Sequence, residues 1–240
     1  MQKQPIYHTL GILGGLGPMA TVYFYEMLTE HTLVTRDQDH IDILISSRAS
    51  TPDRTAFILG QSRETPLPVM VEEANRLVKA GAEVLVLPCN TAHYFYDELS
   101  RQTGAPIINI ITETVSYCVG RGMKKVGLLA TEGTVRSGAY SDKCRAYGLS
   151  IEVPTPEGQQ IINSIIYDDI KQGREPDANR FFRVADELTA RGCETLILGC
   201  TELSLLKKSG RLGPRFTDSL AVLADVTIRA CGKTPVGLLD

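Results

Sequence analysis

The 240-residue sequence contains no tryptophan, and aromatic residues make up only 6% of it. It has no apolar run long enough to span a bilayer, and its first residues contain no apolar signal core. We therefore expect no membrane association and a cytoplasmic location. Lys/Arg clusters never exceed two residues and the net charge is -3, so no nucleic-acid partner is expected either.

The six cysteines have no short regular spacing, and neither a CxxC pair nor an HxxxH pattern occurs. Such a set is a poor disulfide scaffold and fits a reducing compartment. The sequence therefore predicts no zinc site and no other bound metal.

What the sequence does contain is a regular alternation of short apolar runs with helical patterns. Most of the runs are rich in Val, Ile and Leu at consecutive positions, which is typical of parallel strands covered on both faces. The alternation predicts right-handed βαβ units and an α/β fold. The expected strands are Thr9–Leu13, Ile41–Ile45, Val84–Leu87, Ile107–Ile110, Val126–Leu129, Ile151–Val153, Leu196–Leu198 and Arg215–Thr217. Expected helices include Pro68–Ala80, Asp177–Arg191 and a final one near Ser219–Ala230.

The chain also repeats itself. Leu10-Gly-Ile-Leu-Gly14 resembles Val126-Gly-Leu-Leu-Ala130, and a cysteine follows a later apolar run in each half, at Cys89 and at Cys200. We expect two similar α/β lobes, each with a roughly four-stranded, mainly parallel sheet, related by pseudo-twofold symmetry around one site. The predicted division places residues 1–111 and 218–240 in the first lobe and residues 112–217 in the second.

Cys89 and Cys200 each lie where a buried strand ends and a helix is expected to begin. Ligands of open parallel sheets bind at this edge, and the positive end of a helix lowers the pKa of a thiol. The sequence therefore predicts two reactive thiols, one from each lobe, that face a single substrate. The other four cysteines are interpreted as packing residues.

The glycine loop Gly14-Gly-Leu-Gly17-Pro-Met-Ala20 allows two interpretations. It matches a short dinucleotide fingerprint, with Arg48 in a position to suit the phosphate of NADP. It also forms an anion site at a helix start, where a carboxylate is the favoured guest because the fingerprint alone is a weak signal.

Three further side chains have functional and purely structural alternatives. Arg54, in a loop, is either a planar fork for a carboxylate or a solvated side chain, and Lys171 is either a substrate cation or a surface lysine near a helix end. His93 follows Cys89 by one helical turn, but no partner that would orient it can be identified, so a hydrolase dyad is weakly supported.

Together these segments resemble the aspartate/glutamate racemase family, and within it the aspartate racemase branch. The matching segments are Gly14–Pro18, Pro52–Thr55, Pro88–His93, Leu128–Thr134 and Gly199–Glu202. The resemblance implies a two-lobed racemase that uses no cofactor, with Cys89 and Cys200 as its two bases. It also implies that Arg54 and Lys171 bind the substrate's side-chain carboxylate. Contacts to its α-amino and α-carboxylate groups are implied for Asn90, Thr91, Thr131 and Thr201.

The chain departs from the family pattern before the Asp53-Arg-Thr55 motif, where Ser47-Arg48-Ala49 replaces Asn-Asn-Pro, so we expect Arg48 as a second cation in the cleft. The predicted activity is interconversion of L- and D-aspartate, with a small amino acid as the partner and a homodimer as the assembly. Glutamate or a broad range of amino acids is the alternative substrate. Outside this class, an NADP-dependent reductase and a non-catalytic amino-acid-binding protein stay open.

Overall fold

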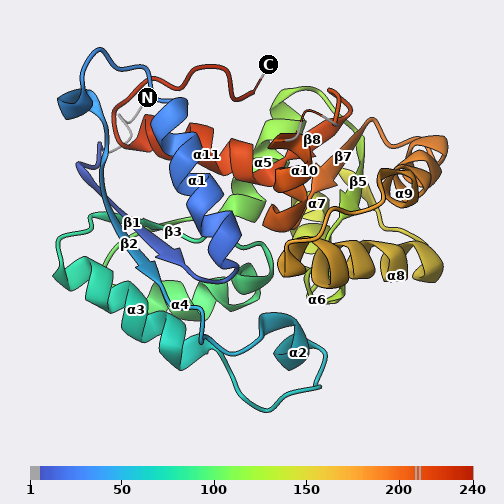
Figure 1. Cartoon of the computed structure of the whole chain (residues 1–240), viewed down its shortest axis with the longest axis horizontal. Coiled ribbons are helices and arrows are strands. Elements are labelled where there is room, and N and C mark those ends of the chain that lie inside the picture. The colour runs from blue at the N-terminus through green and yellow to red at the C-terminus, as the bar shows by residue number, and fades with distance from the viewer. Residues whose placement is uncertain (1–5, 209, 211, 240) are drawn as a thin grey trace.

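The computed structural model describes residues 6–208, 210 and 212–239. Its strands form two four-stranded sheets in which every neighbouring pair is parallel (Figure 1). In spatial order the first sheet consists of β2 (Asp42–Ser47), β1 (Thr9–Gly14), β3 (Val84–Val86) and β4 (Ile107–Ile108). The second consists of β6 (Ser150–Glu152), β5 (Lys125–Leu129), β7 (Thr195–Leu198) and β8 (Phe216–Asp218).

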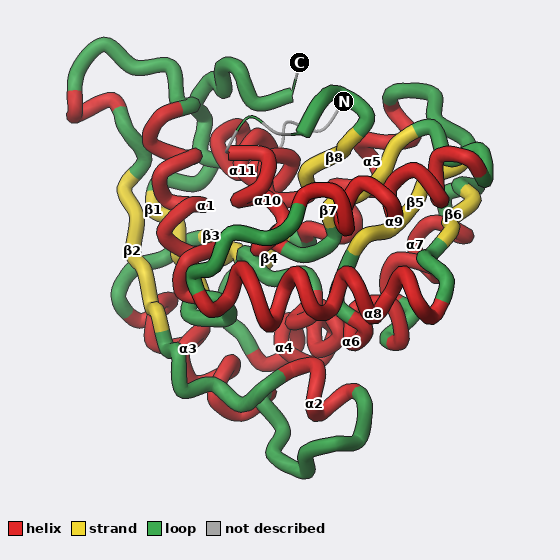
Figure 2. The backbone as a smooth tube through the Cα atoms, turned by 45° about the vertical axis from the view of Figure 1, so that its right-hand side comes forward, coloured by secondary structure: helices red, strands yellow, loops and turns green. Residues whose placement is uncertain are grey.

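Helices connect the strands and cover the sheets (Figure 2). The first half carries α1 (Pro18–Glu30), α2 (Arg54–Ile58), α3 (Leu67–Lys79), α4 (Tyr96–Gln102) and α5 (Ile110–Gly120). The second half carries α6 (Glu132–Arg136), α7 (Ala139–Ala146), α8 (Pro156–Ser164), α9 (Ala178–Ala190), α10 (Thr201–Lys208) and α11 (Ser219–Ala230). Short helical turns are η1 (Asp37–Asp39), η2 (Thr91–Phe95), the π-helical η3 (Ile165–Asp169) and η4 (Ile170–Gln172).

The two sheets repeat one topology, since the first and third strands of each half lie side by side at its centre. The repeat extends to one glycine in each first strand. A Cβ at Gly11 would lie 2.4 Å from Leu85, and a Cβ at Gly127 would lie 2.6 Å from Leu196. Both positions are therefore too crowded for any residue larger than glycine. The predicted α/β class with two similar lobes is confirmed, and the sheets are wholly parallel.

The lobes share a hydrophobic core. One cluster of buried residues runs from Leu10 and Ile12 in β1, through α5 and α11, to Val126 and Leu128 in β5. The helices that follow the last strand of each lobe, α5 and α11, pack against each other. The predicted lobe limits at 111/112 and 217/218 lie inside α5 and β8.

The end of the chain returns to the first lobe. The amide of Leu33 donates to Thr234 O, and the amide of Val236 donates to His31 O, so the tail lies beside the residues that follow α1 (Figure 1). α11 also packs against α1.

Two local details differ from the sequence-based expectation. β2 is an edge strand whose residues are half-buried or exposed, so it is not covered on both faces as β3 and β7 are. The segment after Cys89 forms the 3-10 turn η2 before α4 begins, whereas Cys200 leads directly into α10. Within the described residues, no helix combines the length and apolarity needed to cross a membrane.

Candidate active site

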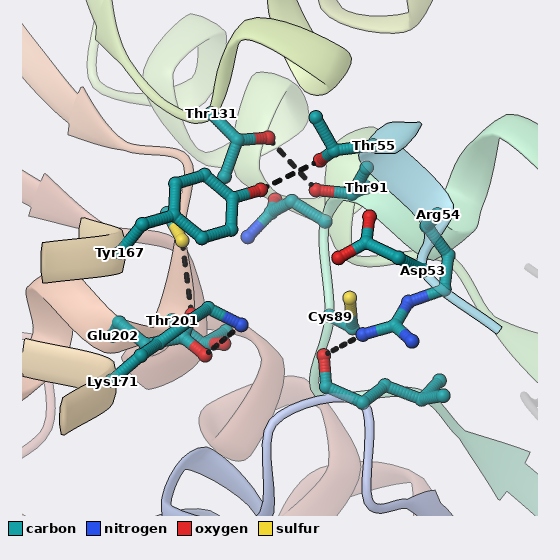
Figure 3. A pocket seen from close by; sticks show the side chains of 13 residues that line it. Asp53, Arg54, Thr55, Cys89, Thr91, Thr131, Tyr167, Lys171, Thr201 and Glu202 are labelled. Atoms are coloured by element: carbon teal, nitrogen blue, oxygen red, sulfur yellow. Dashed lines mark hydrogen bonds and ion pairs between the residues drawn. The ribbon is translucent and has the colours of Figure 1, made fainter. Parts of the chain in front are cut away.

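Cys89 follows β3 and Cys200 follows β7, so both cysteines lie at the carboxyl ends of the third strands of their lobes. The repeat brings them to one cavity between the lobes. Figure 3 shows the side chains around it. The lining residues are Leu16, Asp53, Arg54, Thr55, Cys89, Asn90, Thr91, Thr131, Tyr167, Lys171, Cys200, Thr201 and Glu202.

Cys200 has a carboxylate partner. Its thiol donates to Glu202 Oε2 at 3.0 Å, and Glu202 Oε1 lies 3.1 Å from Lys171 Nζ (Figure 3). Burial raises the pKa of the Cys200 thiol well above its ordinary value, and the negative charge of Glu202 is the second largest cause of this increase. The expectation of a lowered pKa at this helix start is therefore wrong for Cys200, because desolvation and a neighbouring carboxylate outweigh the helix end.

Lys171 is a cation of the cavity, and 30% of its side-chain surface is exposed. Burial alone would lower its pKa, but the charge of Glu202 and the nearby Cys200 raise it above the ordinary value, so the ammonium form is held. Nζ also lies 5.5 Å from the centre of the Tyr167 ring. Tyr167 precedes Lys171 by one helical turn, so both side chains reach the same cavity.

Arg54 begins α2, and its guanidinium is fixed by main-chain carbonyls. Its NH1 group donates to Thr51 O and Pro52 O at 3.1 and 3.0 Å, and its NH2 group donates to Leu16 O at 2.8 Å. The buried Nε atom has no hydrogen-bond partner among the described residues. Figure 3 shows Arg54 beside Cys89, across the cavity from Lys171 and Glu202.

Hydroxyl groups join the two lobes around the cavity. Thr91, Thr131 and Thr134 form a buried triangle with oxygen–oxygen distances of 3.0, 2.8 and 3.0 Å. The Tyr167 hydroxyl donates to Thr55 Oγ1 at 2.8 Å, and this hydrogen bond links α2 to the second lobe. The cavity is therefore walled by polar contacts between the lobes.

Asn90 and Thr201 also hold the lobes together. Asn90 Nδ2 donates to Ser219 Oγ at 3.0 Å, and its Oδ1 accepts from the Tyr140 hydroxyl at 2.7 Å. Thr201 Oγ1 donates to Pro88 O at 3.1 Å. Both residues line the cavity, as expected, but these side-chain atoms already have protein partners.

His93 lies outside the cavity and is fully engaged. Its Nδ1 lies 2.9 Å from Cys89 O, and its Nε2 lies 3.3 Å from the amide of Ile110. These partners require Nδ1–H as the donor and Nε2 as the acceptor. Burial lowers the pKa of His93 to about 4, so the ring is neutral at neutral pH. His93 therefore fixes the main chain of Cys89 and has no nitrogen left to act as a base.

Arg48 is not among the residues that line the cavity. Its NH1 group lies 2.7 Å from Glu73 Oε1 and 3.1 Å from Glu72 Oε2, on α3. The expectation of a second cleft cation is therefore corrected: two carboxylates of the neighbouring helix hold the side chain. The NADP alternative loses the cation that it required for the phosphate.

Side chains of the protein itself contact the glycine loop where an anion was expected to bind. Thr21 Oγ1 accepts from the amide of Gly15 and donates to Gly17 O, both at 3.0 Å. A Cβ at Gly17 would lie 2.3 Å from Glu202 Oε1. The carboxylate beside this loop is therefore a side chain of the second lobe.

All predicted site residues except Arg48 line the cavity. Sequence reasoning missed Leu16, Asp53, Thr55, Tyr167 and Glu202 as cavity residues. Four of them lie inside the segments that carry the family resemblance, and Tyr167 could have been found from its one-turn spacing to Lys171.

The remaining cysteines, Cys118, Cys144, Cys193 and Cys231, are buried and unbridged, and none lines the cavity. Within the ranges that the structure describes, no cluster of three or more His, Cys, Asp or Glu side chains could hold a metal ion.

Comparison with known proteins agrees with this geometry. The family model described as Asp/Glu/Hydantoin racemase matches residues 13–227, so the chain belongs to that family. Its structure is similar to the aspartate racemase of Picrophilus torridus, with a TM-score of 0.81 and 29% identity over 95% of each chain.

Two curated relatives differ in how much of their length is matched. The broad-specificity amino-acid racemase RacX of Bacillus subtilis is 25% identical over 226 residues, which are 91% of this chain and 96% of that protein. A glutamate racemase of Corynebacterium diphtheriae is 32% identical over 182 residues, 73% of this chain but 64% of that racemase.

Proposed function

We propose that this member of the Asp/Glu/hydantoin racemase family interconverts L- and D-aspartate without a cofactor, using Cys89 and Cys200 as its two acid/base groups. The observation that carries the proposal is that both cysteines line one interlobe cavity, which also holds Arg54 and Lys171. Inversion requires a base on one face of the α-carbon and an acid on the other. A pair of thiols supplied by opposite lobes meets that requirement.

The cavity residues also meet the demands of an acidic substrate. The guanidinium of Arg54 supplies positive charge on one wall of the cavity, and Lys171 is a second cation on the opposite wall. An α-proton is very weakly acidic, so negative charge must be stabilised as it develops on the α-carboxylate. The hydroxyls of Thr91 and Thr131 and the main-chain amides after each cysteine are suited to that role.

The pattern of similarity to known racemases supports aspartate over longer substrates. The similarity to the Picrophilus aspartate racemase extends over nearly the whole chain, whereas the glutamate racemase is matched over only part of its length. The similarity to RacX, which is equally complete, favours a broad range as the second candidate.

Chiral chromatography of a panel of L-amino acids after incubation with the protein tests the substrate. Aspartate should racemise fastest, and racemisation of many neutral amino acids at equal rates would instead support the broad range. Failure to racemise any acidic amino acid would reject the proposal. A homodimer in solution is part of the same proposal and is tested by light scattering.

Single-cysteine variants in deuterated water test the two-base mechanism. By family resemblance, Cys200 takes the proton of L-aspartate and Cys89 that of D-aspartate. Cys89→Ala should therefore incorporate deuterium into L-aspartate without forming D-aspartate, and Cys200→Ala should do the same for D-aspartate. Cys193→Ala, a cysteine of similar burial outside the cavity, is the matched control and should racemise normally. Near wild-type racemisation by either cavity variant would refute the mechanism.

A further inference from the structure

Glu202 is buried at the point where three elements meet. It lies on the first turn of α10 with 6% of its surface exposed, and both of its oxygens are engaged. Oε2 accepts from the Cys200 thiol, and Oε1 pairs with Lys171 on η4. Gly17, at the start of α1, leaves room for Oε1 because it has no Cβ. Residues of both lobes thus fix this carboxylate beside one reactive sulfur.

This carboxylate has no counterpart at the equivalent position of the other lobe. The residue two positions after Cys200 is Glu202, whereas the residue two positions after Cys89 is Thr91, whose hydroxyl belongs to the threonine triangle. Within the described part of the chain, the Cys89 thiol makes no hydrogen bond to a carboxylate. The two thiols therefore differ in their neighbours, although the frame around them is repeated.

We propose that Glu202 is a positioning residue that keeps the proton on Cys200 in the free protein, and that Lys171 limits this effect by neutralising the carboxylate. A carboxylate 3.0 Å from the sulfur stabilises the thiol as a hydrogen-bond acceptor and repels the charge of a thiolate. Cys200 then meets the substrate as an acid. The inference rests on the proposed function only for the identity of the reacting thiols.

The groups around Glu202 imply that removing Glu202 and removing Lys171 shift the protonation of Cys200 in opposite directions. Cys200 faces it from the end of β7 and Lys171 from η4, with the Tyr167 ring beside the ammonium; the α1 side presents only the Gly17 main chain. Removing the carboxylate should favour the thiolate. Removing the ammonium should leave an unneutralised carboxylate and favour the thiol.

The test is the pH dependence of alkylation at Cys200 by iodoacetamide, read by mass spectrometry of the Cys200 peptide and without substrate. The midpoint for Glu202→Gln should lie about one pH unit or more below that of the wild type. The midpoint for Lys171→Met should move in the opposite direction. A general disturbance of the site would shift both variants the same way, so opposite shifts identify the electrostatic role.

Glu132→Gln is the matched control, because Glu132 is also a first-turn glutamate of the second lobe but bonds to Asn163 instead of a thiol. It should leave the Cys200 midpoint unchanged. An unchanged midpoint in Glu202→Gln, or a shift of both cavity variants in one direction, would overturn the inference. Because no amino acid is present, a failed racemase assay leaves this result intact, and a failed titration leaves the racemase proposal intact.

Discussion

His93 allows a prediction of how stability depends on pH. Its ordinary pKa is 6.5, and burial lowers it to about 4 in the folded protein. When the pH falls below the ordinary value, the unfolded chain takes up a proton on this ring while the folded protein does not. Stability is therefore present above about pH 6.5 and is lost as the pH falls towards 4. Each pKa unit is worth about 1.4 kcal/mol, so the full loss is about 3 kcal/mol, of which about 2 kcal/mol falls between pH 7 and pH 5.

His93→Gln isolates this contribution. A glutamine amide can donate to Cys89 O and accept from the amide of Ile110, but it does not titrate in this range. Urea unfolding followed by far-UV circular dichroism suits a chain without tryptophan. The difference in unfolding free energy between pH 7 and pH 5 should be about 2 kcal/mol smaller in the variant. Other titrating groups are common to both proteins and cancel in the comparison. Equal losses in the two proteins would refute the assignment of a neutral, buried His93.

Two other substitutions test particular contacts. Gly17→Ala should lower racemase activity about tenfold to a hundredfold, because its Cβ would displace the Glu202 carboxylate, whereas Gly120→Ala, which meets open space, should not. An active Gly17→Ala protein would show that this close approach is dispensable. Arg48→Ala should leave the KM for aspartate unchanged and lower the Tm, because the side chain pairs with α3 and not with the cavity. A raised KM with an unchanged Tm would return Arg48 to the substrate site.

The repeat explains why so much of the fold could be predicted. Most of the strands are marked by consecutive Val, Ile and Leu residues, and two similar Gly and Cys contexts indicate two lobes before any contact is known. The site followed from the same logic, since the third strand of each lobe ends at a cysteine. Parallel topology then brings Cys89 and Cys200 to facing edges.

The sequence could not reveal which hydrogen-bond and ion-pair partners the individual polar side chains have in the folded protein. Arg48 and Arg54 are six positions apart and both follow β2, yet carboxylates of α3 hold the first and main-chain carbonyls hold the second at the cavity. Helix-end reasoning likewise predicted a lowered pKa for Cys200, because it considered only the local dipole. Burial and Glu202 reverse that sign. Such outcomes depend on three-dimensional neighbours, which no local pattern specifies.

The unequal thiols need not favour one enantiomer. L- and D-aspartate have the same free energy in achiral solvent, so the ratio of kcat/KM in the two directions is fixed at unity for any racemase. A carboxylate that holds the proton on Cys200 therefore changes only which form of the free protein is populated. Its influence becomes visible in half-reactions: removal of Glu202 from a Cys89→Ala protein should move deuterium exchange of L-aspartate to lower pH. Equal kcat/KM values for the two enantiomers would thus be no argument against an asymmetric site.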